Sequence, residues 1–405
     1  MEIKNIKKEF PIFKQKINGK PLVYLDSANS SQKPKVVIDK ISNFYETEFS
    51  NVGRSVHTLA VKATNRFEAV RDKVKQYINA KHREEIIFTK GATEGINLVA
   101  SSFGKKYINK GDEILVTELE HHSNYVPWHY LRSEKGAVIK FAQVNSDGDV
   151  EIDEIKKQIT NKTKIIAITH ISNVTGAVLP ITKIVDLAKE RNIPVLIDGT
   201  QGAPHSHIDM QKIGCDFYAI SCHKMFCPNG VGRLYRKKNW VDDLPPYQGG
   251  GGMIDEVKQD SITFAEEHTK FEAGTMQTAE VVSFAEALNF IEKIGIKNIA
   301  SHENKVLEYG LEKLRKNNSV NIIGSPKNRG SVLCFTIKDI HPHDIATILD
   351  EDGVAIRAGH HCCQILHDKL GIAATARASI GVYNDKEDMD ILSESIKNCQ
   401  KVFQV

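Results

Sequence analysis

Residues 181–224 read ITKIVDLAKERNIPVLIDGTQGAPHSHIDMQKIGCDFYAISCHK, and this stretch decides the fold. Ile181–Asn192 has apolar residues at helical spacing, and the short apolar runs Val195–Ile197 and Phe217–Ile220 follow it. Strands separated by helical segments favour right-handed crossover units, which place parallel strands in one sheet covered on both faces. In such a sheet a ligand binds beyond the carboxyl ends of the strands, so the polar residues after each run are candidates for a site.

The same alternation extends in both directions from this stretch. Further apolar runs occur at Ile86–Phe88, Ile114–Val116, Val138–Phe141, Ile165–Ile168 and Val231–Tyr235. We therefore predict an α/β fold whose large domain, residues 20–295, holds a mostly parallel mixed sheet. The pattern then changes to apolar runs at Val332–Ile337 and Val354–Arg357 and helical segments at His343–Asp352 and Lys386–Phe403. This change predicts a smaller α+β domain at residues 296–405, joined by the N-terminal segment 1–19.

Length and composition are those of a soluble globular chain. The 405 residues, 26% of them charged and 41% hydrophobic, suggest two or three domains. Lysine and arginine outnumber aspartate and glutamate by only 54 to 51, so no electrostatic argument points to nucleic acid or an anionic membrane. No apolar run approaches the ~18 residues of a spanning helix, and Met1–Phe10 carries no apolar signal-peptide core. We expect a cytoplasmic protein with neither nucleic-acid nor membrane partners.

An acid and a lysine terminate two successive predicted strands. Asp198 directly follows Val195–Ile197, and Lys224 comes shortly after Phe217–Ile220. Taken alone, Asp198 is compatible with a turn residue and Lys224 with a solvated surface lysine. Together they suit a pyridine aldehyde cofactor, because Lys224 can form a Schiff base with the aldehyde and Asp198 can keep the ring nitrogen protonated.

Three further polar clusters follow predicted strands. Thr89–Gly95 has a glycine turn and a hydroxyl before a helix, which favours an anion site, although Thr93 acting only as a helix cap is the alternative. His121 lies in the polar segment 118–124, where an imidazole can stack on a flat ligand ring. The third polar cluster, Thr169–Gly176, directly follows the apolar run Ile165–Ile168.

The segment Arg357–Cys363 ends in two histidines and two cysteines. Nearby imidazoles and a guanidinium lower a thiol pKa, so we expect lowered pKa values for both Cys362 and Cys363. Neighbours in an extended loop point to opposite sides, so only one of them should face a ligand. A metal site is the alternative, but four consecutive residues do not readily wrap one tetrahedral ion, and no CxxC spacing occurs among the seven cysteines. We expect no metal.

The order and spacing of these motifs resemble the SUF-type (group II) cysteine desulfurases, pyridoxal 5′-phosphate enzymes of the class V aminotransferase group. The matching motifs are Gly91-Ala-Thr-Glu-Gly-Ile-Asn97, Glu120-His-His122, Asp198-Gly-Thr-Gln201, Ser221-Cys-His-Lys224, Phe271-Glu-Ala-Gly-Thr275 and Arg357-Ala-Gly-His-His-Cys362. The resemblance extends from Leu25 to Ser379 and covers nearly the whole chain. It implies a fold-type I homodimer that holds pyridoxal 5′-phosphate between its two domains and the partner subunit.

The resemblance also implies a role for each matching residue. Lys224 is the cofactor-bound lysine, Asp198 the partner of the ring nitrogen, and Cys362 the nucleophile that takes the sulfur as a persulfide. His121 stacks on the ring and moves protons, while Gln201 contacts the ring hydroxyl oxygen. The phosphate ligands are Thr93, Ser221 and His223, with Thr275 from the other subunit, and the substrate carboxylate is surrounded by Asn173, Arg357 and Arg377.

The chain departs from the family pattern at several positions. Cys222 stands where glycine is usual, Cys363 where alanine is usual, and Ala92 where threonine is common. Gly53 occupies the place of a histidine that many members carry before the arginine matched by Arg54.

The function implied by the resemblance is conversion of L-cysteine to L-alanine, with the sulfur held on Cys362. The sulfur would pass to a SufU-like or SufE-like acceptor protein for iron–sulfur cluster assembly. A selenocysteine lyase or a cysteine sulfinate desulfinase is the alternative within the same chemistry, and selenocysteine lyase activity is an expected side activity. A cofactor-free sulfur or metal carrier that uses His360–Cys363 is the alternative outside it.

Overall fold

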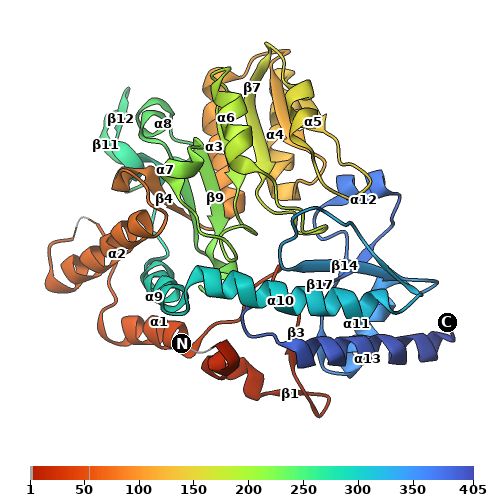
Figure 1. Cartoon of the computed structure of the whole chain (residues 1–405). Helices are drawn as coiled ribbons and strands as arrows, with labels where there is room; N and C mark the ends of the chain where they lie inside the picture. The colour runs from red at the N-terminus through yellow and green to blue at the C-terminus, as the bar shows by residue number, and fades with distance from the viewer. Residues whose placement is uncertain (1–2, 54) are drawn as a thin grey trace.

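A seven-stranded sheet forms the centre of the computed structural model, which describes residues 3–53 and 55–405 (Figure 1). Its strands are β4 (Ile86–Thr89), β5 (Glu113–Thr117), β6 (Val138–Ala142), β7 (Thr163–Thr169), β8 (Val195–Asp198), β9 (Phe217–Ser221) and β10 (Gly232–Arg236). Their order is β4-β10-β9-β8-β7-β5-β6, and β10 alone runs antiparallel to both of its neighbours in this sheet. The predicted mostly parallel mixed sheet is confirmed.

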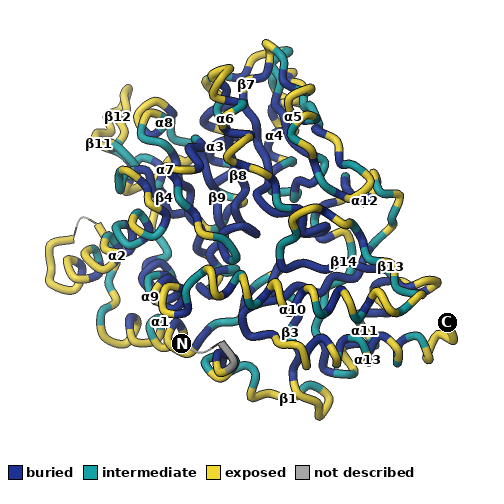
Figure 2. The backbone as a smooth tube through the Cα atoms, viewed as in Figure 1, coloured by how far each residue is buried: buried dark blue, intermediate teal, exposed yellow. Residues whose placement is uncertain are grey.

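Helices cover both faces of this sheet, which is why its strands are continuous apolar runs. On one face α3 (Ala92–Tyr107), α4 (Val126–Lys135) and α8 (Lys238–Asp243) pack against alternate strand residues such as Ile87 and Leu196. The other face is covered by α2 (Thr58–Tyr77), α5 (Ile152–Gln158), α6 (Ile181–Lys189), α7 (Met210–Ile213) and α9 (Thr278–Ile294). Figure 2 shows β8 and β9 as the buried centre between these layers.

A second layer lies at the C-terminal end of the chain. A four-stranded antiparallel sheet has the order β13 (Val320–Ile322), β14 (Val332–Ile337), β17 (Thr375–Ser379) and β16 (Arg357–Gly359). It packs with α10 (Ile296–Arg315), α11 (Pro342–Glu351) and α13 (Lys386–Phe403) around a core of its own. Gly295, with φ of 86°, separates α9 from α10. The α+β character of this layer agrees with the sequence pattern, while the division into two domains at this point stays a prediction.

The N-terminal segment joins the two layers. Strand β3 (Val23–Tyr24) pairs in parallel with β15 (Val354–Ala355), and Asp26 forms an isolated bridge with Ser379. The predicted single run Val354–Arg357 is therefore divided between two sheets, because β15 pairs with β3 whereas β16 pairs with β17. Residues 26–33 then cross from the C-terminal layer, where Asp26 bridges Ser379, to the end of β9, where the Ser31 N–H donates to His223 O.

The described chain contains these further elements: η1 (Ile3–Glu9), η2 (Pro11–Lys14), η3 (Arg83–Glu85), η4 (His122–Asn124), η5 (Cys222–Lys224), η6 (Glu267–Phe271), α1 (Lys35–Thr47), α12 (Gln364–Leu370), β1 (Lys16–Ile17), β2 (Lys20–Pro21), β11 (Ile254–Val257) and β12 (Ile262–Phe264). Among the described residues, no helix combines the length and the apolar character needed to cross a membrane.

Candidate active site

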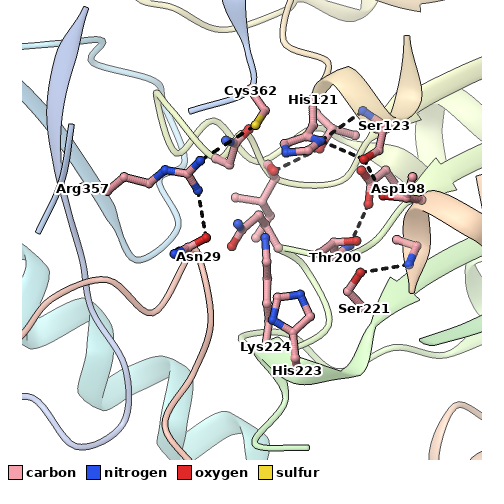
Figure 3. A pocket seen from close by; sticks show the side chains of 16 residues that line it. Asn29, His121, Ser123, Asp198, Thr200, Ser221, His223, Lys224, Arg357 and Cys362 are labelled. Atoms are coloured by element: carbon pink, nitrogen blue, oxygen red, sulfur yellow. Dashed lines mark hydrogen bonds between the residues drawn. The ribbon is translucent and has the colours of Figure 1, made fainter. Parts of the chain in front are cut away.

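A polar pocket opens beyond the carboxyl ends of β7, β8 and β9, where the parallel sheet places it. Strand ends, loops and the N-terminal segment all contribute to its wall. The lining residues are Asn29, Ala92, Thr93, His121, Ser123, Thr169, Ile171, Asn173, Asp198, Thr200, Gln201, Ser221, His223, Lys224, Arg357 and Cys362. Figure 3 shows Lys224 reaching into this space, with Asp198 on one side and Cys362 with Arg357 on the other.

Asp198 and Lys224 face the same pocket because β8 and β9 are neighbouring parallel strands. Burial raises the pKa of the Asp198 carboxyl, and hydrogen bonds from Thr200 together with the charge of Lys224 oppose that rise. Burial, followed by the charge of Arg377, lowers the pKa of Lys224 to about 8. Lys224 is therefore an amine that loses its proton near pH 8, well below an ordinary lysine, which favours attack or proton acceptance by this amine.

The N-terminus of α3 forms one end of the pocket. Gly91 is the N-cap of this helix, so Thr93 is not its cap, and the Thr93 hydroxyl instead pairs with Ser123 Oγ at 2.7 Å. The Ala92 N–H donates to Ser221 Oγ (2.9 Å), which ties the helix to the end of β9. A Cβ on Gly232 would lie 2.3 Å from Gly91 Cα, so this close approach requires glycine. Free helix N–H groups with nearby hydroxyls favour an anion here.

His121 lies close to this end of the pocket, because Ser123 Oγ is within hydrogen-bond distance of both Thr93 Oγ1 (2.7 Å) and His121 Nδ1 (3.1 Å). Its Nδ1 accepts a hydrogen bond from the Ser123 N–H (3.1 Å). Burial and then the Lys224 charge lower its pKa to about 3. Behind it, the buried Glu120 carboxyl group accepts from Thr117 Oγ1, Asn124 Nδ2 and the Thr169 N–H, and burial raises its pKa to about 8. These contacts hold the loop so that the His121 ring stays in the pocket wall.

The two adjacent cysteines have opposite surroundings. Cys362 lines the pocket, and Arg357 Nη2 lies 3.8 Å from its sulfur. Cys363 is fully buried, and its thiol lies 3.2 Å from Leu119 O and 3.1 Å from Glu120 O. Burial raises the Cys363 pKa well above its usual value, so the expectation of a lowered pKa for this thiol is wrong.

The expectation of an extended loop around Cys362 is also wrong, because this segment forms a turn. His361 (φ 52°) and Cys362 (φ 57°) both lie in the left-handed region, which non-glycine residues rarely adopt. Hydrogen bonds hold this turn, since the His122 N–H donates to Cys362 O and Asn173 Nδ2 donates to His361 O, each at 2.7 Å. The two thiols point apart because of this turn rather than because of strand-like alternation.

The remaining candidates lie at different depths. Gln201 lines the pocket and donates to Ala28 O (2.7 Å). Arg377 is buried behind the wall, where it pairs with Asp26 and donates to Asn173 O, each at 3.2 Å. Thr275 is exposed and lies outside the pocket lining of this chain.

Sequence reasoning missed several lining residues. Asn29 Oδ1 accepts from Arg357 Nη1 (2.9 Å), and Ser123 pairs with Thr93. Thr200 donates its N–H to Asp198 (3.0 Å). The sequence position of two of these residues could have identified them. Thr200 lies inside the Asp198–Gln201 motif, and Ser123 directly follows His121 and His122. No sequence pattern identifies Asn29, since it reaches the site only because the chain crosses between the layers.

The donor set suits pyridoxal 5′-phosphate rather than a metal. Lys224 matches an aldehyde, the buried Asp198 matches a protonated ring nitrogen, and the α3 N-terminus with Ser221 matches a phosphate. Within residues 3–53 and 55–405, no group of three or more histidine, cysteine, aspartate and glutamate side chains is arranged to hold a metal ion.

Comparison with known proteins gives one consistent family. The model of the aminotransferase class-V family matches residues 23–392. A probable cysteine desulfurase of Halalkalibacterium halodurans is 44% identical over 100% of this chain and 99% of its own length. One of Staphylococcus epidermidis is 46% identical over 99% of this chain and 98% of its own length.

Solved structures agree with the sequence comparison. The cysteine desulfurase CsdA of Escherichia coli has a TM-score of 0.92 at 34% identity, and the apo cysteine desulfurase of Thermococcus onnurineus has 0.94 at 32%. Each pairing covers 99% of both chains. A C-DES mutant with glycine covalently linked to its pyridoxal phosphate cofactor, 20% identical with a TM-score of 0.82, shares the fold. With the family model covering most of its length and such relatives matching throughout, this chain belongs to the aminotransferase class-V family of pyridoxal 5′-phosphate enzymes.

Proposed function

We propose that this protein is a pyridoxal 5′-phosphate-dependent cysteine desulfurase, a sulfurtransferase that converts L-cysteine to L-alanine and takes the sulfur onto Cys362. The names of its relatives and the donor set of its pocket support the activity. The observation that carries the proposal is that Lys224 and Cys362 line one pocket, while the adjacent Cys363 is buried against Leu119 and Glu120. One lysine and one thiol are therefore available together to the same substrate.

The cofactor would be held by residues already placed in the pocket. Thr93, Ser221 and His223 would hold its phosphate, Asp198 and Gln201 would contact its ring, and His121 would stack on the ring; all six residues line the pocket. When bound, the cofactor supplies an electron sink for a carbanion next to the substrate amine. The low pKa of Lys224, about 8, suits this amine to accept the Cα proton of the substrate.

Sulfur transfer completes the reaction at the other wall. The Cys362 sulfur attacks the substrate sulfur, an S–S bond forms, and the substrate Cβ–S bond breaks. Cysteine and the Cys362 thiol thereby give alanine and a Cys362 persulfide, so the substrate carbon is reduced and the enzyme sulfur is oxidised without an outside oxidant. His121 lines the same pocket and would exchange protons with the substrate. Arg357 and Asn173 line the pocket and would bind the substrate carboxylate, while Arg377, buried behind them, would support this end by donating to Asn173 O.

The wider role rests on the SUF-type motifs. We propose that the persulfide sulfur goes to a SufU-like or SufE-like acceptor for iron–sulfur cluster assembly in the cytoplasm. We also propose a homodimer in which Thr275, exposed in this chain, reaches the phosphate end of the partner's pocket. Sedimentation of the holoenzyme tests the dimer, and a fully active monomer would contradict it.

The decisive experiment compares Cys362→Ser with its matched control Cys363→Ser. Each holoenzyme receives L-cysteine, alanine and sulfide are measured, and mass spectrometry locates the added sulfur. We expect Cys362→Ser to lose nearly all sulfide release and Cys363→Ser to keep most of it, with the added mass on Cys362. Full turnover by Cys362→Ser, or added sulfur on Cys363, would contradict the assignment. L-Selenocysteine in the same assay tests the side activity, because selenium can leave without a protein thiol and Cys362→Ser would then stay active.

A further inference from the structure

Lys33 is a half-buried cation that lies against the turn carrying Lys224. Its Nζ donates to His223 O (2.9 Å), to Ser30 Oγ (3.3 Å) and to Ser31 O. No carboxylate among the described residues pairs with it, and burial lowers its pKa to about 8. The Lys33 ammonium group therefore donates hydrogen bonds to three neutral oxygens, on residues that lie at or beside the pocket.

The hydrogen bonds around Ser30 fix the direction of each proton. A lysine ammonium has donors only, so Ser30 Oγ accepts from Lys33 and keeps its own proton to donate. That proton has two possible acceptors, His223 Nδ1 at 3.2 Å and His223 O at 3.4 Å. The carbonyl already accepts from Lys33 and from the Ser31 N–H and hydroxyl, at 2.9, 3.2 and 3.0 Å. The Ser30 hydroxyl therefore donates to His223 Nδ1.

This arrangement determines the state of the His223 ring. Burial, with the charges of Lys224 and Lys33, lowers the His223 pKa to about 4, so the ring is neutral at physiological pH. A neutral imidazole whose Nδ1 accepts carries its proton on Nε2. His223 lies beside Ser221 in the pocket wall (Figure 3). Among the described residues, no hydrogen bond engages its Nε2.

We propose that Lys33 is a positioning residue: through Ser30 it holds His223 in the neutral Nε2–H tautomer, so that this ring donates to the phosphate of the cofactor. The opposite tautomer would present an acceptor lone pair to the phosphate and repel it. Lys33 itself does not touch the ligand, and its effect reaches the pocket through one hydroxyl. This inference rests on the proposed function, because it takes the anion at the α3 end to be the cofactor phosphate.

Two ligands separate a role at the phosphate from a general structural role. The apoprotein is titrated with pyridoxal 5′-phosphate and with pyridoxal, which has the aldehyde and ring but no phosphate. The variants are Lys33→Met and Ser30→Ala, with Lys35→Met, an exposed lysine paired with Asp39, as the control. We expect both test variants to lose about tenfold in affinity for the phosphate ester, or ~1.4 kcal/mol. Their affinity for pyridoxal, and both affinities of Lys35→Met, should not change.

Equal weakening of both ligands would overturn the proposal, because it would show that Lys33 only shapes the turn around Lys224. Unchanged affinity in both test variants would overturn it as well. A wild-type apoprotein that binds neither ligand would instead contradict the proposed function.

A direct measurement of the tautomer does not depend on affinity. Nitrogen-15 NMR of the histidine side chains in the apoprotein, with His223 assigned by substitution, reports which ring nitrogen carries the proton. We expect the proton of wild-type His223 on Nε2, and a mixture of tautomers in Lys33→Met and in Ser30→Ala. A wild-type ring protonated on Nδ1 would overturn the proposal. Thermal unfolding of each variant shows whether it is folded, and Ser30→Thr, which keeps the hydroxyl, should behave as wild type.

Discussion

The two walls of the pocket are built by different means. The sheet wall carries Asp198 at the end of β8 and Lys224 in η5, directly after the neighbouring strand β9, and burial moves the pKa of each group away from its ordinary value. The C-terminal wall carries Cys362 on a turn in which two consecutive non-glycine residues have positive φ. The first wall therefore controls protonation through burial, while the second controls which sulfur is reachable through backbone conformation. Changes to the two walls should have different signatures.

The largest effect is expected at Lys224 on the sheet wall. Lys224→Ala would remove the amine that we propose bonds the cofactor and accepts the substrate Cα proton, so alanine formation should fall roughly a thousandfold or more. The visible absorbance of the lysine-bound cofactor should also disappear, as measured by spectroscopy of the purified protein. Lys157→Ala, an exposed lysine on α5, is the control and should retain both. A near-normal rate in Lys224→Ala would contradict the proposal that the sheet wall supplies the reactive amine.

Asp198→Asn keeps the shape of the side chain and removes its charge. Because the carboxylate would no longer hold a proton on the pyridine nitrogen, we expect turnover to fall by about a hundredfold, while the lysine-bound cofactor remains detectable. The control is Asp209→Asn, whose carboxylate caps α7 at the surface, and this variant should keep its turnover. Steady-state rates with L-cysteine are measured, and equal, wild-type rates in the two variants would show that the charge of Asp198 has no chemical role.

The pKa of Lys224 gives a test with a defined pH window. Because its folded pKa, about 8, lies below the usual value, the unfolded chain binds more protons between about pH 8 and 10.5, and apoprotein stability should rise with pH through this window. Near pH 8 about half of the Lys224 amine is neutral, against well under ~1% of an ordinary lysine. Cyanate labelling followed by mass spectrometry should thus show a midpoint near pH 8 for Lys224. A midpoint equal to that of exposed lysines would contradict the burial argument.

The smallest effect is expected on the C-terminal wall. Arg357→Gln removes the contacts to Asn29 and to the Cys362 sulfur, so the KM for L-cysteine should rise by about tenfold, with a smaller change in kcat. The visible absorbance of the cofactor should stay as in wild type, because none of the residues along its ring changes. Loss of the cofactor band in Arg357→Gln would show that the two walls are not separable.

Several features of the fold were predictable from the sequence because they depend on local patterns. Strands buried on both faces are short apolar runs, so the seven strands and the terminal helix Lys386–Phe403 were found near their observed bounds. Residues at or just after the ends of such strands, among them Asp198, Ser221 and Lys224, were placed correctly at one sheet edge, because parallel strands end together. The domain division, the Thr275 role and the dimer stay predictions.

The sequence by itself determined which residues are near strand ends and which chemistry they offer together. Only the tertiary structure decided how deeply each group is buried and which atoms it faces. Adjacent thiols in one charged segment look alike in sequence, yet the turn at His361 and Cys362 exposes one thiol to the pocket and buries the other. Asn29 lines the pocket, and Lys33 contacts the turn that carries Lys224, only because the chain crosses from one layer to the other. Burial and backbone direction depend on contacts between segments far apart in the chain, and no local pattern encodes such contacts.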